Sequence, residues 1–284
     1  MSEVAAPRSS IELTRQSAAM ALRSLVFNLV FYACLVALAI FGLPTILLGR
    51  RRVIGLARLW GAISTWRLDK ICGLRVEYRG VENIPSGGYI IAAKHESFLE
   101  TFALLKHAPD FAIVLKKQLV YIPVFGWYLL RAGQIAIDRA RSLSALARMM
   151  ARAREALRAG RQVFVFPEGT RRPPGAPPRY KFGVAALYEE SGAPCLPVAL
   201  NTGLFWGRRG FSRRPGVAVI EYLPPILPGL DRAAFCERLE NDIEAACARL
   251  NAEAVGADAH LAPILAAGRA TVDRPAPAEA RGRA

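Results

Sequence analysis

The clearest indication of the fold is the segment Ile90-Ile91-Ala92-Ala93-Lys94-His95-Glu96-Ser97-Phe98-Leu99-Glu100-Thr101. Its first four residues are small and apolar, as in a buried strand, and a helix is expected to begin near Ser97. His95 lies in the turn between the two. Ligands of open α/β sheets bind in the crevice beyond the carboxyl ends of the strands, so His95 is a candidate functional residue.

Glu100 follows His95 by five residues. On one continuous helix the two side chains would point about 140° apart, so they can pair only if His95 precedes the helix and Glu100 lies in its first turn. With Ser97 as the N-cap, Glu100 would be the third helical residue. The same spacing also fits a capping box, in which Glu100 accepts a hydrogen bond from a backbone N–H and has no catalytic role. The residues alone leave both interpretations open.

The chain has 284 residues, enough for one large domain or two small ones. Lys and Arg number 38 against 23 Asp and Glu, which gives a net charge of +15. This excess indicates a polyanionic partner, such as nucleic acid, an anionic membrane surface or a phosphorylated substrate. Because 53% of the residues are hydrophobic and the mean hydropathy is positive, a membrane-associated protein is favoured over a soluble nucleic-acid binder.

Several common chemistries find no support in the sequence. The five cysteines are widely spaced and form no Cys-x-x-Cys pair, so neither a disulfide framework nor a zinc site is expected, and a reducing cytosolic environment is the simpler interpretation. Neither common form of glycine-rich phosphate loop occurs, and Gly-x-Ser-x-Gly is absent. Nucleotide-dependent phosphoryl transfer, hydride transfer and a serine hydrolase are therefore not indicated.

Residues 24–49 contain no charged side chain. As a helix they would be about 39 Å long, against about 30 Å of bilayer hydrocarbon. The run is longer than the core of a signal peptide, and Arg50-Arg51-Arg52 follow it, so a retained anchor is predicted. It can span the membrane, or bend back at Gly42 and Pro44 as a monotopic hairpin. Five arginines follow the run and three precede it, so the C-terminal side is expected in the cytoplasm, at the inner membrane.

From residue 73 onward, short apolar runs alternate with helical patterns, which predicts a mixed, mostly parallel α/β sheet of about seven strands flanked by helices. The expected strands are 75–79, 89–93, 111–115, 134–137, 162–166, 195–200 and 217–223. Amphipathic helices are expected at 142–159 and 231–251, and a helix at 53–71 that lies at the lipid interface or packs on the domain. The predicted organisation is an anchor at 1–72, an α/β domain at 73–252 and a loose tail at 253–284.

Polar residues follow four of the predicted strands, at the point where each strand ends. These groups are Lys116-Lys117, Asp138-Arg139, Pro167-Glu168-Gly169-Thr170-Arg171-Arg172 and Asn201-Thr202-Gly203. Parallel strands would collect them at one edge of the sheet, beside His95. Arginine and lysine suit a phosphate group, and a glycine lets the backbone approach a ligand closely. Ordinary turns with local ion pairs are the alternative for any single group.

Four segments, in this order, resemble the motifs of the glycerolipid acyltransferase family. They are Lys94 to Thr101, Gly133 to Arg139, Phe166 to Arg171 and Leu196 to Gly203. Within that family the chain looks most like the bacterial 1-acyl-sn-glycerol-3-phosphate acyltransferases, which make phosphatidic acid from lysophosphatidic acid. The likeness extends over about residues 25–250. One departure is Glu100, where the family usually has Asp.

The resemblance implies a direct acyl transfer in which His95 is the general base and Glu100 orients its ring. It also implies that Arg139 and Arg171, with Lys116 or Lys117, hold the phosphate of the acceptor. Glu168, Gly169 and Thr170 would shape the same site, and Asn201, Thr202 and Gly203 would shape the acyl-donor side. The donor would be acyl-CoA or acyl-carrier protein, with no cofactor, no metal and no nucleic-acid partner, and the site would face the cytoplasm.

The sequence alone leaves two alternatives to this function open. One is an acyltransferase with another acceptor, such as glycerol 3-phosphate or a lyso-aminolipid. The other is a basic membrane-bound protein that binds anionic lipid or nucleic acid without catalysis. Formation of acyl product from a supplied donor and lysolipid would distinguish the enzymes from the binding protein.

Overall fold

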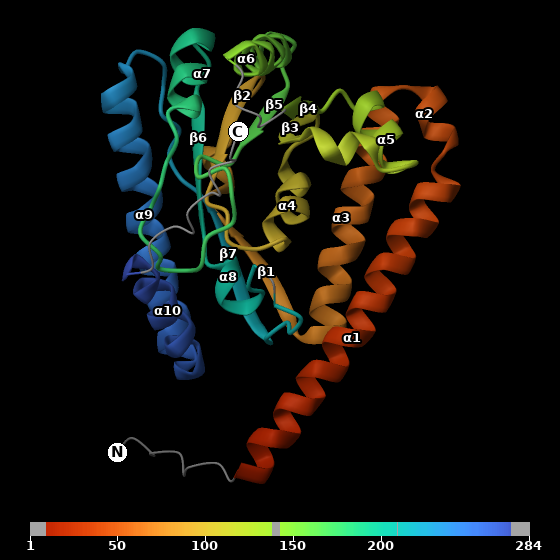
Figure 1. Cartoon of the computed structure of the whole chain (residues 1–284), viewed down its shortest axis with the longest axis vertical. Helices are drawn as coiled ribbons and strands as arrows, with labels where there is room; N and C mark the ends of the chain where they lie inside the picture. The colour runs from red at the N-terminus through yellow and green to blue at the C-terminus, as the bar shows by residue number, and fades with distance from the viewer. Residues whose placement is uncertain (1–9, 138–142, 209, 274–284) are drawn as a thin grey trace, which may run out of the picture.

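The computed structural model describes residues 10–137, 143–208 and 210–273 (Figure 1). Its centre is a seven-stranded sheet in the order β1-β7-β6-β2-β5-β3-β4. The strands are β1 (Leu74–Arg79), β2 (Tyr89–Ala93), β3 (Phe111–Lys116), β4 (Ile135–Ile137), β5 (Gln162–Val165), β6 (Cys195–Leu200) and β7 (Gly216–Tyr222). Each strand lies within one residue of its predicted bounds. The prediction succeeds because a strand buried in the middle of an α/β fold has a short, continuous apolar sequence.

Strand direction explains why the polar groups meet. The pairs β2–β5, β2–β6, β3–β5 and β3–β4 are all parallel, so five strands point the same way. Only β7 runs antiparallel to β6, and β1 follows β7 in parallel. The carboxyl ends of β2, β3, β4, β5 and β6 therefore lie along one edge of the sheet. The mixed, mostly parallel sheet confirms the predicted fold class.

Helices cover both faces of the sheet. They are α3 (Arg50–Cys72), α4 (Leu99–Ala103), α5 (Phe125–Arg131), α6 (Leu143–Arg158), α7 (Gly183–Ser191), α8 (Thr202–Phe205), α9 (Arg232–Ala257) and α10 (Ala262–Arg269). Ile91 and Ala93 of β2 belong to the core shared with α3 and α4, whereas Ile90 and Ala92 belong to the core shared with α6, α7 and α9. This alternation follows from the two-residue period of a strand, and it leaves β2 buried on both faces.

The N-terminal segment forms a helical hairpin on the domain. Helix α1 (Ser10–Phe41) is followed by the short α2 (Pro44–Leu48), and α3 returns beside α1 (Figure 1). Within the described residues, Ser17–Phe41 is the one helical stretch long and apolar enough to cross a membrane. Phe27 and Phe31 on one face of α1 are buried against the domain. Large apolar side chains are exposed elsewhere on α1: Leu22, Leu25, Val26, Leu29, Tyr32, Val36, Ile40 and Phe41.

Helix α3 combines the two arrangements expected for residues 53–71. Ile54 and Leu68 are fully buried in the core shared with α4 and β1, whereas Leu59 and Trp66 are exposed. One face of α3 therefore packs on the domain, and exposed apolar side chains remain on the other.

The structure differs from the expected loose tail after residue 252. Helix α9 continues to Ala257, and η4 (Ala259–Leu261), α10 and η5 (Ala270–Asp273) follow it. Leu261 is buried in the core, and a side chain at Gly268 would collide with the backbone of Pro174. The Ala- and Pro-rich composition concealed these apolar contacts. Residues 274–284 of the predicted tail lie outside the described residues.

Candidate active site

His95 and Glu100 come together at the carboxyl end of β2. The strand ends at Ala93, and α4 begins at Leu99, two residues after the expected N-cap. The His95 Nδ1 atom lies 2.8 Å from Glu100 Oε1. His95 therefore precedes the helix and Glu100 lies in its first turn, which is the one arrangement in which this spacing allows the two side chains to pair.

Glu100 accepts hydrogen bonds from four groups. Its Oε1 atom also accepts from the backbone N–H of Glu96 at 2.9 Å and of Ser97 at 2.7 Å, and Oε2 accepts from Thr202 Oγ1 at 2.8 Å. The bond from Ser97 is the one that a capping box requires. The two interpretations of Glu100 are thus compatible, because one carboxylate oxygen holds the turn and His95 together. These four hydrogen bonds fix the position of this fully buried side chain.

The imidazole of His95 is fixed in one orientation. Its ring stacks on Phe166, with the centroids 4.0 Å apart and the planes 22° apart. The side chain remains 16% exposed and lines a cavity. When Nδ1–H donates to Glu100, the lone pair of Nε2 is free to accept a proton. A positioned imidazole with a carboxylate behind it is the arrangement of a general base.

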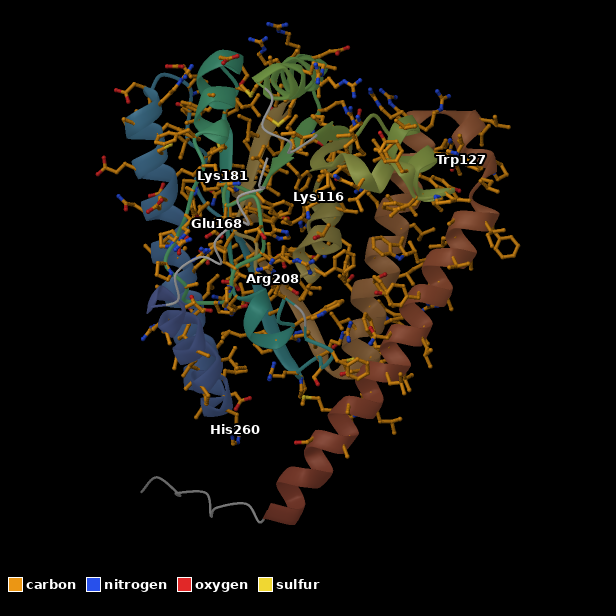
Figure 2. All side chains as sticks on the ribbon, in the orientation of Figure 1. Lys116, Trp127, Glu168, Lys181, Arg208 and His260 are labelled. Atoms are coloured by element: carbon orange, nitrogen blue, oxygen red, sulfur yellow. The ribbon has the colours of Figure 1, made fainter. Side chains whose placement is uncertain are left out.

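The cavity beside His95 has a volume of about 890 Å³ and lies along the carboxyl edge of the sheet. Four cationic side chains line it, namely Lys116, Arg171, Lys181 and Arg208, three of them labelled in Figure 2. None of the four is within ion-pair distance of a carboxylate in the described part of the chain. The rest of the wall is largely apolar: Ile113, Val114, Leu115, Leu119, Ile137, Met149, Val165, Val184 and Leu187.

The structure brings together part of the predicted site. His95, Lys116, Gly169, Thr170 and Arg171 all line this cavity. Gly169 has a φ of +67°, and a Cβ there would lie 3.2 Å from Lys181 Nζ, so glycine leaves room for the lysine beside the cavity.

Lys117 and Arg139 complete the set of predicted phosphate-binding cations. Lys117 begins the short helix η3 (Lys117–Tyr121) and is not part of the cavity wall. Arg139, with Asp138, lies outside the described residues.

Glu168 lies behind the cavity, not in its wall. Its carboxylate is 3.4 Å from Lys94 Nζ and 3.4 Å from Arg172 Nε. Lys94 Nζ also donates to Glu244 of α9 at 2.7 Å, and Tyr180 donates to the same carboxylate. Burial alone would lower the pKa of Lys94, but the two carboxylates outweigh it and raise that pKa. This ionic cluster joins the ends of β2 and β5 to α9, so Glu168 supports the site from behind.

Asn201, Thr202 and Gly203 also lie behind the pair, and none of them lines the cavity. Asn201 accepts from the backbone N–H of Val219 and donates to the carbonyl of Leu250, which ties β6 to β7 and α9. Thr202 donates to Glu100, as described above. The predicted acyl-donor role of these three residues stays a prediction, and in the structure Thr202 holds the carboxylate of Glu100.

Glu96 has an unusual environment beside His95. It is 1% exposed, its Oε2 atom accepts from the backbone N–H of Gly203 at 3.0 Å, and its Oε1 atom has no hydrogen-bond partner. Burial raises the pKa of Glu96 to about 8, although Lys94 opposes the shift. A Cβ at Gly203 would lie 2.8 Å from this carboxyl group, so the close packing requires a glycine there.

Sequence reasoning missed Lys181 and Arg208. Both lie in connecting segments, and neither follows a strand end directly. The positive φ of Gly169 and the backbone bond from Lys181 N to Pro167 O place Lys181 over the cavity, and no sequence motif signals that contact. In the part of the chain that the structure describes, no group of three or more His, Cys, Asp or Glu side chains comes together as metal ligands would.

The chain is similar to known acyltransferases. A family model described as Acyltransferase matches residues 75–201. The 1-acyl-sn-glycerol-3-phosphate acyltransferase of Pseudomonas aeruginosa is 38% identical over 176 residues, which cover 62% of this chain and 68% of that protein. The mouse 1-acyl-sn-glycerol-3-phosphate acyltransferase alpha is 28% identical over 207 residues, which cover 70% of this chain and 71% of that protein.

A solved structure shares the fold. It is the 1-acyl-sn-glycerophosphate acyltransferase of Thermotoga maritima, with a TM-score of 0.68, 23% identity, and coverage of 81% of this chain and 96% of that one. At this identity the likeness concerns the fold alone. The similarity to these sequence relatives shows that the chain belongs to the 1-acyl-sn-glycerol-3-phosphate acyltransferase family and is an acyl-transferring enzyme.

Proposed function

We propose that the protein transfers a fatty acyl group from acyl-CoA or acyl-carrier protein to the free sn-2 hydroxyl of lysophosphatidic acid, giving phosphatidic acid. The observation that carries this proposal is the His95–Glu100 pair, 2.8 Å apart, at the wall of a cavity lined by both cationic and apolar side chains. The names of the sequence relatives support the same acceptor.

In the proposed reaction, His95 Nε2 takes the proton of the acceptor hydroxyl as its oxygen attacks the thioester carbonyl. An ester C–O bond forms, the C–S bond breaks, and the imidazolium returns the proton to the departing thiolate. Glu100 holds the ring and stabilises its protonated form. The thioester arrives with the donor as a co-substrate, and the reaction as written requires no cofactor.

The cationic side chains of the cavity suit the acceptor phosphate. Arg171 and Lys116 were predicted for this role, and Lys181 and Arg208 line the same cavity. A phosphate monoester accepts several charge-assisted hydrogen bonds, and these four cations have no carboxylate partner among the described residues that would compete for them. The apolar wall between β3, β5, α6 and α7 is suited to an acyl chain.

We further propose that the helical hairpin attaches the protein to the cytoplasmic face of the inner membrane without crossing it. Phe27 and Phe31 pack on the domain, so α1 is held beside α3 and both ends of the hairpin stay on one side. The exposed apolar face of α1 would enter the lipid, as in monotopic proteins. An N-terminal tag should then be cleaved by protease in inverted vesicles only. Cleavage in right-side-out vesicles would indicate a spanning helix.

The function is tested with the purified full chain in neutral detergent. Labelled lysophosphatidic acid is incubated with a panel of acyl-CoA and acyl-carrier-protein donors, and phosphatidic acid is quantified. We expect product with at least one donor class, and competition by glycerol phosphate analogues. Absence of product with every donor, or equal acylation of a lyso-aminolipid that lacks phosphate, would contradict the proposed acceptor.

A further inference from the structure

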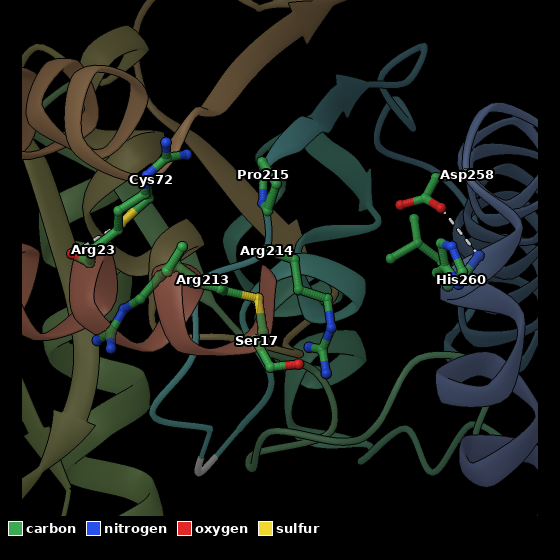
Figure 3. A pocket seen from close by; sticks show the side chains of 11 residues that line it. Ser17, Arg23, Cys72, Arg213, Arg214, Pro215, Asp258 and His260 are labelled. Carbon is green, nitrogen blue, oxygen red and sulfur yellow. Dashed lines mark hydrogen bonds between the residues drawn. The ribbon is translucent and has the colours of Figure 1, made fainter. Parts of the chain in front are cut away.

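A second cavity of about 510 Å³ lies on another part of the molecule (Figure 3). It is bounded by the N-terminal part of α1, the end of α3 at Cys72, the segment before β7, and η4 after α9. Figure 3 shows Arg214 and Pro215 between the wall formed by α1 and the C-terminal helices that carry Asp258 and His260. It shares no lining residue with the cavity beside His95.

The second cavity is positively charged. Arg23, Arg213 and Arg214 line it, against one carboxylate, that of Asp258. Asp258 Oδ1 accepts from the backbone N–H of His260 and so caps the short helix η4. Among the described residues, no carboxylate lies within 4.0 Å of any of the three guanidinium groups. Three arginines that line one cavity, none of them paired with a carboxylate, are suited to an anionic group such as a phosphate.

Arg213 is the least expected of the three, because it is buried. It is 6% exposed, its guanidinium lies 4.2 Å from the ring centroid of Trp206, and one terminal nitrogen donates to the carbonyl of Phe211. Its Nε atom is buried and has no hydrogen-bond partner. Burying a cation with an unsatisfied donor is costly, and burial lowers the pKa of Arg213. The rings of Trp206 and Phe27 offset part of this cost, and an anion in the cavity would offset more of it.

The position of the cavity along α1 indicates where the anion comes from. Arg23 is the last charged residue before the uncharged run at 24–49. Leu22, Leu25, Val26 and Leu29 around it are exposed. A basic residue at the end of an apolar membrane-binding face lies at the level of the lipid headgroups, where phospholipid phosphates are concentrated.

We propose that Arg23, Arg213 and Arg214 bind the phosphate group of an anionic membrane phospholipid, at a site separate from the catalytic cavity. The acyl chains of this lipid lie along the exposed apolar face of α1. The backbone N–H of Arg213 donates to Ser24 Oγ, so the loop that carries two of the arginines is attached to α1 beside the bound lipid.

The test is native mass spectrometry of the full chain, released from neutral detergent micelles that contain phosphatidylglycerol or phosphatidylcholine. The variants are Arg23→Gln and Arg214→Gln, because Arg23 is exposed and Arg214 half-buried, whereas Arg213→Gln risks misfolding. Arg158→Gln, an exposed arginine of α6, is the charge-matched control. Loss of one charge-assisted contact typically weakens binding about ten-fold or more.

We expect the wild type and Arg158→Gln to retain one phosphatidylglycerol that phosphatidylcholine does not replace, and each site variant to bind it about ten-fold more weakly. Equal retention in Arg158→Gln and in Arg23→Gln and Arg214→Gln would overturn the proposal, as would equal retention of phosphatidylcholine. Inorganic phosphate is added in a further arm. If it displaces the phospholipid at equal concentration, the site binds free phosphate and the assignment to a membrane lipid is wrong.

Discussion

The buried carboxyl group of Glu96 should make the protein less stable as the pH rises. Its Oε2 atom accepts from Gly203 N, and its Oε1 atom has no partner, so the group is better accommodated with a proton than without one. Burial raises its pKa from 4.5 to about 8. The substitution Glu96→Gln keeps a carbonyl oxygen for the bond from Gly203 and removes the titration.

The magnitude follows from the two pKa values. Below pH 4.5 Glu96 is protonated in both the folded and the unfolded chain, so its ionisation does not change the free energy of unfolding. Between 4.5 and about 8 the unfolded chain loses its proton and the folded chain keeps it, so stability falls as the pH rises and then levels off. A difference of about 3.5 pKa units at about 1.4 kcal/mol each gives an upper limit of about 5 kcal/mol.

The assay is thermal unfolding in neutral detergent, followed by tryptophan fluorescence at pH 5 and pH 8.5. We expect Glu96→Gln to resemble the wild type at pH 5 and to unfold at a higher temperature at pH 8.5, by about 2 °C or more per kcal/mol. Glu155→Gln, an exposed glutamate of α6, is the matched control and should follow the wild type at both pH values. Identical pH profiles of the wild type and Glu96→Gln would refute the reasoning.

Four further substitutions test other contacts. Glu100→Gln should lower kcat about 100-fold, less than removal of His95, whereas an unchanged kcat would leave Glu100 only its capping role. Thr202→Val removes a bond to that carboxylate and should lower kcat about ten-fold with little change in KM; a change confined to KM would count against it. Arg171→Ala should raise KM for lysophosphatidic acid about ten-fold, and an unchanged KM would place the phosphate elsewhere. Lys94→Met removes the cation between Glu168 and Glu244, which keep Arg172 and Tyr180 as partners, and should lower the free energy of unfolding by about 3 kcal/mol; unaltered thermal unfolding would show that the cluster contributes nothing.

The sequence predicted the sheet well because its central strands are buried on both faces. Tyr89–Ala93 and Cys195–Leu200 are continuous apolar runs, and both have the predicted bounds. The polar residues that follow them meet because five strands are parallel. The spacing of His95 and Glu100 allowed their pairing, but only the structure shows that one oxygen of Glu100 serves both the histidine and the turn.

The sequence could not supply contacts between residues that are far apart in the chain. The bonds from Thr202 to Glu100 and from Gly203 to Glu96 join residues more than 100 positions apart. Nor could the sequence show that Lys94 and Arg172 lie beside the carboxylate of Glu168. Charged side chains are usually exposed, and only the folded structure shows that Lys94 and Glu168 are buried together.

The central claim is that His95 removes the proton from the acceptor hydroxyl. The most direct test is kcat of folded His95→Ala, measured with lysophosphatidic acid and the preferred donor, with the fold checked by thermal unfolding. The geometry predicts a fall of about 100- to 10,000-fold at an unchanged unfolding temperature. A folded His95→Ala protein that turns over like the wild type would contradict the mechanism.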